Sequence, residues 1–357
     1  MTTFVGDIDP GSAGKRPGPH GSRSPVAVLI PPELRLAACA RLVADHAPEP
    51  QLAARRFIET AADLGIDLSL MWGTLDASGT TVRQVCLAVV GAGRTAMMFL
   101  SGDTKRKVSA GKAAEEAAAE RVAIVEAACR TLAEPIKGKT RQGVRLAQAL
   151  LEAHETPVLD ALRRAGFRQL GDLAYMRRDP GPLTSVQRAR ALPAGFRMAS
   201  VAELTMAGMS SADIDRLLLE ILEASYIDTR DCPELCGLRE AGDVLESHKA
   251  VGRYDPALWW ILYEGQSPVG CALFSVSPEH DSLELVYLGL APIARGRSVG
   301  TAFLDAALVK LGESILMSGG VTCAVDTRNT AALRLYQRAG FKRFGIRIPM
   351  IRSLASK

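Results

Sequence analysis

A short basic segment in the second half of the chain, residues 295–300 (RGRSVG), combines two glycines with two arginines. An apolar run over residues 283–290 precedes it, and a pattern with helical periodicity follows it. Backbone N–H groups at a helix N-terminus can hold a pyrophosphate, and glycines let the backbone approach it closely. Arg295 and Arg297 add positive charge for phosphate oxygens. Alone, the segment predicts either a phosphate site or a simple connection between strand and helix.

A second polar group follows the next apolar run. Residues 321–325 predict a strand, and Asn329 stands where a helix over residues 330–339 should begin, with Tyr336 two turns into it. Asparagine is a favoured helix cap, so Asn329 needs no further role. As a tyrosine on an amphipathic helix, Tyr336 needs none either. By themselves these residues predict a capped helix after a strand.

Together the two segments resemble the GNAT superfamily of N-acetyltransferases. The superfamily's phosphate motif, [QR]-x-x-G-x-[GA], is similar to residues 295–300, with Ser298 at the place of the central glycine. If the pattern is shifted along the sequence by two places, it is satisfied by Arg297, Gly300 and Ala302. The later motif, V-x3-N-x2-A-x3-Y-x3-G-F, is matched at every place by Val325, Asn329, Ala332, Tyr336, Gly340 and Phe341.

The resemblance implies a site for acetyl-CoA as co-substrate. Where superfamily enzymes splay one strand from its neighbour, often at a bulge, unpaired backbone N–H groups face the coenzyme. Residues 283–290 correspond to that strand. The residues expected at the coenzyme are Leu288, Gly289, Leu290, Arg295, Gly296, Arg297, Ser298, Val299, Gly300, Thr301 and Asn329.

Two side chains are expected to carry the chemistry, because acetyl transfer needs a neutral amine and a proton for the departing thiolate. By the resemblance, Tyr336 gives that proton, and a phenol with a pKa near ~10 is adequate against a thiol near ~8.5. Glu284 is expected to deprotonate the amine, directly or through water, if its side chain points to the cleft. An exposed strand glutamate paired with a surface lysine or arginine is the alternative for Glu284.

The acceptor is expected to be an amine of a small molecule or peptide. Residues 226–233 (YIDTRDCP) correspond in position to the variable acceptor-side loop of GNAT folds. We expect Tyr226, Asp228 and Asp231 to be the substrate contacts, since two carboxylates would attract an ammonium group. A solvated polar turn explains the same residues equally well.

An internal sequence repeat indicates which structural elements position these residues. Residues 162–171 (LRRAGFRQLG) are echoed by residues 336–345 (YQRAGFKRFG), and the match continues to Met176 and Met350. In each copy a helical stretch ends at a glycine and passes into an alternating run, as a capped helix before a strand does. Such a repeat indicates duplication. We therefore predict a disordered tail over 1–24, a degenerate GNAT-like domain over 25–180, a linker over 181–194 and a catalytic GNAT domain over 195–357.

The fold class predicted is mixed α/β (α+β), with two tandem domains that each hold a mostly antiparallel central sheet flanked by helices. Strands are expected over 26–30, 68–74, 82–90, 96–101, 259–264, 269–275, 283–290 and 321–325, and helices over 51–64, 112–132 and 330–339. The first copy has Leu162 at the place of Tyr336 and Glu155 at the place of Asn329. A leucine cannot donate a proton, so the first copy is expected to shape the acceptor cleft rather than to catalyse.

Composition excludes several classes of function. Lys and Arg number 43 against 39 Asp and Glu, an excess too small to indicate nucleic acid or an anionic membrane as the main partner. No apolar run reaches the ~18 residues of a membrane span. Seven scattered cysteines favour reduced thiols and a cytoplasmic location. The Cys232 and Cys236 pair lacks two further ligands at zinc spacing, so no metal is predicted.

The first hypothesis is an acetyl-CoA-dependent N-acetyltransferase that works by direct attack in a ternary complex. A non-catalytic acyl-CoA sensor or scaffold, or an acyltransferase that uses another acyl donor, is the alternative.

Overall fold

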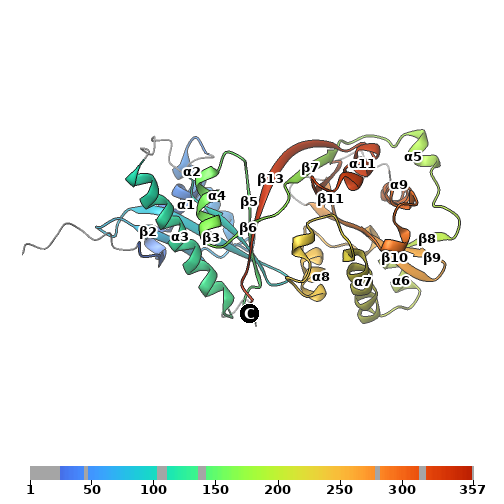
Figure 1. Ribbon diagram of the computed structural model, residues 1–357, viewed down its shortest axis with the longest axis horizontal. Helices are drawn as coiled ribbons and strands as arrows, with labels where there is room; N and C mark the ends of the chain where they lie inside the picture. Colours follow the sequence, from blue (N-terminus) through green and yellow to red (C-terminus); the bar gives the residue numbers. More distant parts are fainter. Residues whose placement is uncertain are drawn as a thin grey trace, which may run out of the picture.

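The computed structural model describes residues 25–43, 47–102, 111–135, 142–277, 282–312 and 319–355. The tail expected over residues 1–24 lies outside them. Two α/β halves lie side by side, with the first half at the left of Figure 1 and the second at the right. Within the described ranges, no helix is both long enough and apolar enough to cross a lipid bilayer.

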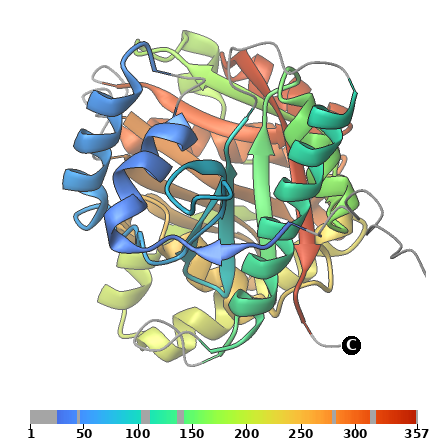
Figure 2. The same ribbon diagram turned by 90° about the vertical axis from the view of Figure 1, so that its left-hand side faces the viewer.

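The first half is a sheet covered on both faces. Its strands are β1 (Val28–Leu29), β2 (Met71–Leu75), β3 (Val82–Gly91), β4 (Thr95–Leu100), β5 (Leu146–Leu151), β6 (Arg168–Gln169) and β7 (Leu173–Arg178). Its helices are α1 (Arg35–Val43), α2 (Pro50–Ala61), α3 (Lys112–Ala133) and α4 (Thr156–Arg164), and a 3-10 turn, η1, spans Pro32–Leu34. Helices α1 and α2 pack on one face and α3 and α4 on the other (Figure 2). Helix α1 was not predicted, because its buried residues Ala38, Cys39 and Ala40 are small and give a weak apolar stripe.

The second half has the same layered arrangement. Its strands are β8 (Phe196–Ser200), β9 (Trp259–Glu264), β10 (Ser267–Ser277), β11 (Ser282–Leu290), β12 (Val321–Asp326) and β13 (Lys342–Ser353). Its helices are α6 (Val201–Met206), α7 (Ser211–Tyr226), α8 (Ala241–Lys249), α9 (Val299–Leu311) and α11 (Thr330–Arg338), and 3-10 turns span η2 (Pro233–Leu235), η3 (Pro256–Leu258) and η4 (Pro292–Ala294). Helices α9 and α11 cover one face, and α6, α7 and α8 cover the other.

The strands form one continuous sheet in the order β1-β2-β3-β4-β5-β13-β7-β12-β11-β10-β9-β8, with β6 paired to β13. Among the named strands of the described ranges, β4 with β5 and β11 with β12 are the parallel pairs, and the other pairs are antiparallel. The predicted mixed, mostly antiparallel α/β class is therefore confirmed.

The two halves exchange their last strands. Strand β7 of the first half pairs with β12, with Ala174 opposite Val325, and the end of β13 pairs with β5, with Ile348 opposite Leu151. The sequence repeat aligns Val325 with Leu151 and Ala174 with Ile348, so the two exchanged pairs are images of each other. Strand β13 therefore runs from one half into the other (Figure 1). This shared register supports the duplication.

The connector between the halves packs on the second half. It contains the short helix α5 (Ser185–Ala189), whose N-cap Thr184 forms a capping box with Gln187. The Gln187 side-chain amide donates to Asp305 Oδ1 at 3.3 Å, and Leu183 is buried in the core under α9. The connector therefore anchors α9, the helix that follows the glycine-bearing segment.

Candidate active site

A cleft of about 730 Å³ opens where two parallel strands separate. Strands β11 and β12 pair at Leu283 with Val321 and at Glu284 with Thr322, and the rest of β11 has no partner on β12. Val286 is the extra residue of a β-bulge opposite β10, at the start of this unpaired stretch. The cleft is walled by the end of β11, the start of α9, helix α11 and the loop after α7.

Most of the residues that the sequence singled out line this cleft. They are Tyr226, Asp228, Asp231, Leu288, Gly289, Leu290, Arg295, Gly296, Ser298, Val299, Gly300, Thr301, Asn329 and Tyr336. Arg297 and Glu284 are not among its lining residues. Three further residues that were not predicted also line the cleft: Arg230 on the acceptor-side loop, and Arg334 and Arg338 on α11. The signal available for the last two was their position two residues either side of Tyr336 on a predicted helix.

The segment before α9 has a left-handed backbone at two positions. Gly296 has φ 73°, and Ser298, the N-cap residue of α9, has φ 59° and ψ 7°. Side chains other than glycine adopt this region at a cost of about 1 kcal/mol. At Gly300, a Cβ would lie 3.1 Å from Leu335 and 3.3 Å from Leu290. Because the left-handed residue is Ser298, the geometry favours the alignment that puts Ser298 at the central glycine of the phosphate motif.

We expect Ser298→Gly to raise the free energy of unfolding by about 0.5–1 kcal/mol, because glycine removes the left-handed strain. Chemical denaturation measures this change. Ser298→Ala is the matched control: it retains a Cβ and removes a hydroxyl that makes no capping hydrogen bond, so it should bring no gain. Equal stability of the glycine and alanine variants would show that the left-handed backbone at Ser298 is not strained.

Arg295 holds the acceptor-side loop to the end of β11. Its guanidinium donates to the carbonyl oxygens of Ser225 at 2.7 Å, Ile227 at 2.7 Å and Asp228 at 3.2 Å. Its Nε donates to the carbonyl of Leu290 at 2.9 Å. These bonds use most of the side chain's donors, so the expected contact between Arg295 and phosphate oxygens gives way to a structural role.

Arg297 points to a different partner. Its guanidinium makes a two-pronged ion pair with Glu264, at 2.8 and 3.1 Å, and lies 5.0 Å from the ring centre of Phe196. The side chain is thereby directed to β9 and β8. The described arginines that line the cleft and are exposed on α11 are Arg334 and Arg338.

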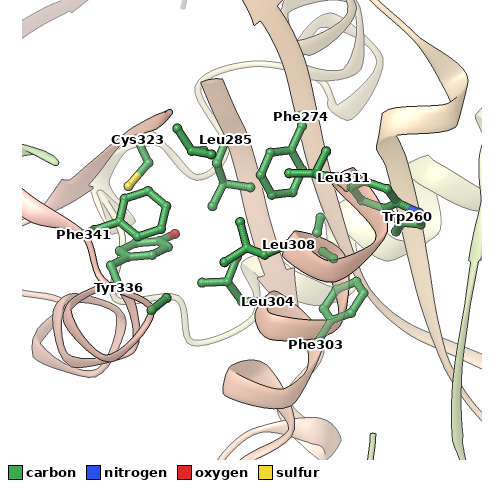
Figure 3. Packing of buried hydrophobic residues seen from close by; sticks show 14 of the residues in the cluster. Trp260, Phe274, Leu285, Phe303, Leu304, Leu308, Leu311, Cys323, Tyr336 and Phe341 are labelled. Carbon is green, nitrogen blue, oxygen red and sulfur yellow. The ribbon is translucent and has the colours of Figure 1, made fainter. Parts of the chain in front are cut away.

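Tyr336 lies at the inner end of the cleft with 6% of its surface exposed. Its ring packs beside Phe341, with 5.6 Å between ring centres, and near Cys323 (Figure 3). Burial, with smaller effects of Cys323, Asp231 and Tyr287, raises the pKa of Tyr336 well above its ordinary value. Among the described residues, none hydrogen-bonds its hydroxyl. The phenol is therefore protonated at neutral pH, and its O–H remains available to a group in the cleft.

Asn329 is both a helix cap and a wall of the cleft. Its Oδ1 accepts a hydrogen bond from the Ala332 N–H at 3.1 Å. Tyr287, which the sequence did not single out, lines the cleft from β11, and its hydroxyl is 2.6 Å from Ser225 Oγ. The cleft thus has tyrosines on both of its sides.

The far end of the acceptor-side loop is tied to β12 by a fully buried carboxylate, Asp326. Asp326 accepts from the Cys232 N–H at 3.1 Å and from Arg328 Nη2 at 2.6 Å, and Arg328 also binds Glu234 at 2.6 and 2.9 Å. Burial favours a higher pKa, but the hydrogen bonds from Arg328 and Cys232 outweigh it and lower the pKa of Asp326. The backbone N–H of Asp326 donates to Asp231 Oδ1 at 2.8 Å.

Comparison with known proteins matches residues 221–341 to the acetyltransferase (GNAT) family. The match lies within the second half of the chain and runs from the end of α7 to the end of α11. Mycothiol acetyltransferase of Geodermatophilus obscurus is 33% identical over 98 residues, which cover 26% of this chain and 31% of that protein. Mycothiol acetyltransferase of Rhodococcus erythropolis is 34% identical over 129 residues, which cover 34% of this chain and 42% of that protein. The matched stretches thus span less than half of either relative.

The fold similarity extends over nearly the whole chain. The crystal structure of a GCN5-related N-acetyltransferase from Sphaerobacter thermophilus covers 93% of this chain and 96% of its own, with a TM-score of 0.54 and 17% identity. This likeness shows that both halves together form a fold that a known structure shares over nearly its whole length.

Glu284 lies on β11 before the strands separate. Its side chain is exposed and outside the lining of the cleft. Protein atoms around the carboxylate raise the pKa of Glu284 by desolvation. Burial is the main cause that raises the pKa of Tyr175 on β7, and the negative charge of Glu284 raises it further. Glu284 therefore pairs with β12, which separates it from the exchanged strand β7.

The first copy of the repeat has the same strand geometry without the phenol. Strands β4 and β5 pair from Thr95 to Met97 with Leu146 to Gln148, as β11 and β12 do at their start. Leu162, at the place of Tyr336, is completely buried in an apolar core with Val125 and Leu100. The described part of this copy thus has packed side chains where the second copy has the phenol of Tyr336.

Proposed function

We propose that the protein is an acetyl-CoA-dependent N-acetyltransferase that transfers an acetyl group to an amine of a small molecule or peptide, by direct attack in a ternary complex. The observation that carries the proposal is that one cleft gathers a helix N-terminus, an unpaired strand edge and a buried phenol. The names of the two mycothiol acetyltransferases support acetyl transfer. The GNAT family match covers the segment that forms most of this cleft.

The residues at the start of α9 fit a pyrophosphate. Residues 296–301 line the cleft apart from Arg297, and the first backbone N–H groups of a helix have no partner within it. Arg334 and Arg338 add positive charge from α11. Gly300 packs closely under Leu335 and Leu290, which holds the helix start against β11. We propose that this chain binds the coenzyme phosphates mainly through backbone N–H groups.

The chemistry follows from the groups around the unpaired edge. The amine nitrogen attacks the thioester carbonyl. The backbone N–H groups of Leu288 and Leu290, which lie on the edge of β11 that faces away from β10, can bind the oxygen as it gains charge, whereas the N–H of Gly289 faces β10. When the carbon–sulfur bond breaks, Tyr336 gives its proton to the sulfur. The products are an acetylated amine and the free thiol of CoA. Within the described residues, no group of three or more His, Cys, Asp or Glu side chains is placed to hold a metal ion.

An acyl-CoA sensor or scaffold without turnover is the second candidate, and a specific observation favours it. Ser298 keeps a Cβ at the left-handed position of the phosphate segment, and the two arginines of that segment bind protein groups. A weakened phosphate site would suit a binding protein better than an enzyme.

A charge reversal at Gly296 tests the coenzyme site. A Cβ there meets no atom within 4 Å, and Asp and Asn tolerate its left-handed φ. We expect wild type to bind acetyl-CoA at micromolar concentration in calorimetry. Gly296→Asp should weaken binding at least about tenfold, because like charges repel at the helix start. Gly296→Asn, whose side chain has the same shape as aspartate without its charge, should weaken acetyl-CoA binding far less.

Two results would count against the site. Failure of wild type to bind at millimolar coenzyme would remove the acetyl-CoA assignment. Equal losses in the Asp and Asn variants would show that negative charge does not matter at this helix start, and so that the phosphates lie elsewhere.

A further inference from the structure

We propose that Asp231 is the base that takes the proton from the acceptor amine. The proposal rests on the proposed acetyl transfer and names the residue that completes it. Asp231 and Tyr336 line the same cleft, whereas Glu284, which the sequence favoured for this role, does not.

The Asp231 carboxylate is held by one oxygen and open at the other. Oδ1 accepts the Asp326 backbone N–H at 2.8 Å. Oδ2 has no hydrogen-bond partner among the described residues, and the residue remains exposed to the cleft. A base must be fixed in direction yet have a free lone pair for the incoming proton. The Asp231 carboxylate meets both conditions.

The loop that carries Asp231 is held at both ends. Arg295 binds the carbonyls of Ser225, Ile227 and Asp228 before it, and Asp326 binds the Cys232 N–H after it. Asp228 and Cys232 have left-handed φ values of 51° and 44°, which cost energy in residues other than glycine. The surrounding bonds thus maintain a backbone path that directs Asp231 into the cleft.

The charged and titratable groups around Asp231 suit proton acceptance. They come from β12 and its end (Cys323, Asp326, Arg328), from the loop itself (Cys232), from β11 (Tyr287) and from α11 (Tyr336). The residue keeps exposed surface, but protein atoms surround its carboxyl group, and this desolvation is the largest influence and raises the pKa of Asp231. The hydrogen bond from the Asp326 N–H lowers that pKa, the Asp326 charge raises it and Arg328 lowers it. A carboxylate with a raised pKa is a stronger base than an ordinary aspartate at neutral pH.

The proton that the amine loses and the proton that the sulfur gains are exchanged between groups of the same cleft. As the nitrogen–carbon bond forms, the amine loses one proton to Asp231 Oδ2. As the carbon–sulfur bond breaks, the sulfur receives one proton from Tyr336. Return of the proton from Asp231 to the tyrosinate, directly or through water, restores both groups, so no oxidant, reductant or further reactant is needed.

The test is a steady-state comparison of Asp231→Asn, Glu284→Gln and wild type. Glucosamine, cysteine amide, tyramine and spermidine serve as probe amines, and release of the CoA thiol is followed. Glu220→Gln is the matched control, since Glu220 is exposed on α7 outside the cleft and makes no described hydrogen bond. Acetyl-CoA affinity of each protein is measured by calorimetry.

We expect Asp231→Asn to retain acetyl-CoA affinity and to lose at least about 100-fold in kcat/KM for the amine near neutral pH. The deficit should shrink as the pH rises, because hydroxide ion can then accept the amine proton in place of Asp231. Glu284→Gln should lose less. A merely structural role for Asp231 would lower coenzyme affinity and leave a deficit that does not depend on pH.

Turnover of Asp231→Asn close to wild type, a deficit independent of pH, or the larger loss in Glu284→Gln would overturn the assignment of Asp231 and leave the proposed function in place. Absence of amine-dependent thiol release in wild type itself would instead refute the acetyl transfer, and the base with it.

Discussion

Replacing Tyr336 with phenylalanine is expected to lower kcat of acetyl transfer about 10²–10³-fold, the usual contribution of a positioned general acid. The phenol is buried at the inner end of the cleft, and phenylalanine keeps its shape and its packing on Phe341. Acetyl-CoA affinity should therefore change little. Steady-state kinetics with a probe amine, and calorimetry with acetyl-CoA, measure the two quantities separately.

The pH dependence gives a second measure of the same role. Burial raises the pKa of Tyr336 well above its ordinary value, and the protonated phenol is the active form. Wild type should therefore show no loss of kcat from ionisation of Tyr336 as the pH rises to about 10.

Tyr254→Phe is the matched control, because Tyr254 is 37% exposed and lies outside the cleft. It should keep wild-type kcat. A Tyr336→Phe variant with undiminished kcat would show that the thiolate leaves without this proton, and would remove the catalytic role proposed for the phenol.

Truncating Met350 is expected to destabilise the first half of the chain although the residue lies near the C-terminus. Met350 on β13 is completely buried in the core that α3, α4 and β5 form. Met350→Ala should lower the free energy of unfolding by about 2–5 kcal/mol, through lost burial and the cavity it leaves. Denaturation measures the total, and hydrogen exchange at β5, α3 and α4 locates it.

Ile346→Ala, on the same strand where it pairs with β7, is the control. Ile346 is 40% exposed, so its truncation should lower the free energy of unfolding by less than about 1 kcal/mol. If Met350→Ala instead raised exchange in the second half alone, the strand exchange would be contradicted.

The sequence predicted the cleft because motif spacing reports local geometry. A strand, a glycine-bearing turn and a helix start follow one another along the chain, so Gly296, Gly300 and Asn329 come to the cleft by local folding. The same holds for Tyr336, whose helix begins at its own cap, Asn329.

Contacts between distant segments could not be predicted in this way. Arg295 was expected at phosphate oxygens, yet it binds carbonyls of a loop about 70 residues earlier in the chain. The strand exchange could not be predicted for the same reason. Alternating apolar residues along β7 and β13 predict strands, but they do not show which half's sheet each strand joins, because each half has a sheet edge that could pair with either strand. Asp231 was expected only as a substrate contact, because the bond from Asp326 that orients it joins two segments 95 residues apart.

Acetyl transfer is tested by whether purified wild-type protein releases the CoA thiol from acetyl-CoA only when a primary amine is added. We expect amine-dependent release, with one acetyl group gained by the amine and detected by mass spectrometry. Binding of acetyl-CoA with no acetylated product from any of the four probe amines would contradict it and favour the acyl-CoA sensor.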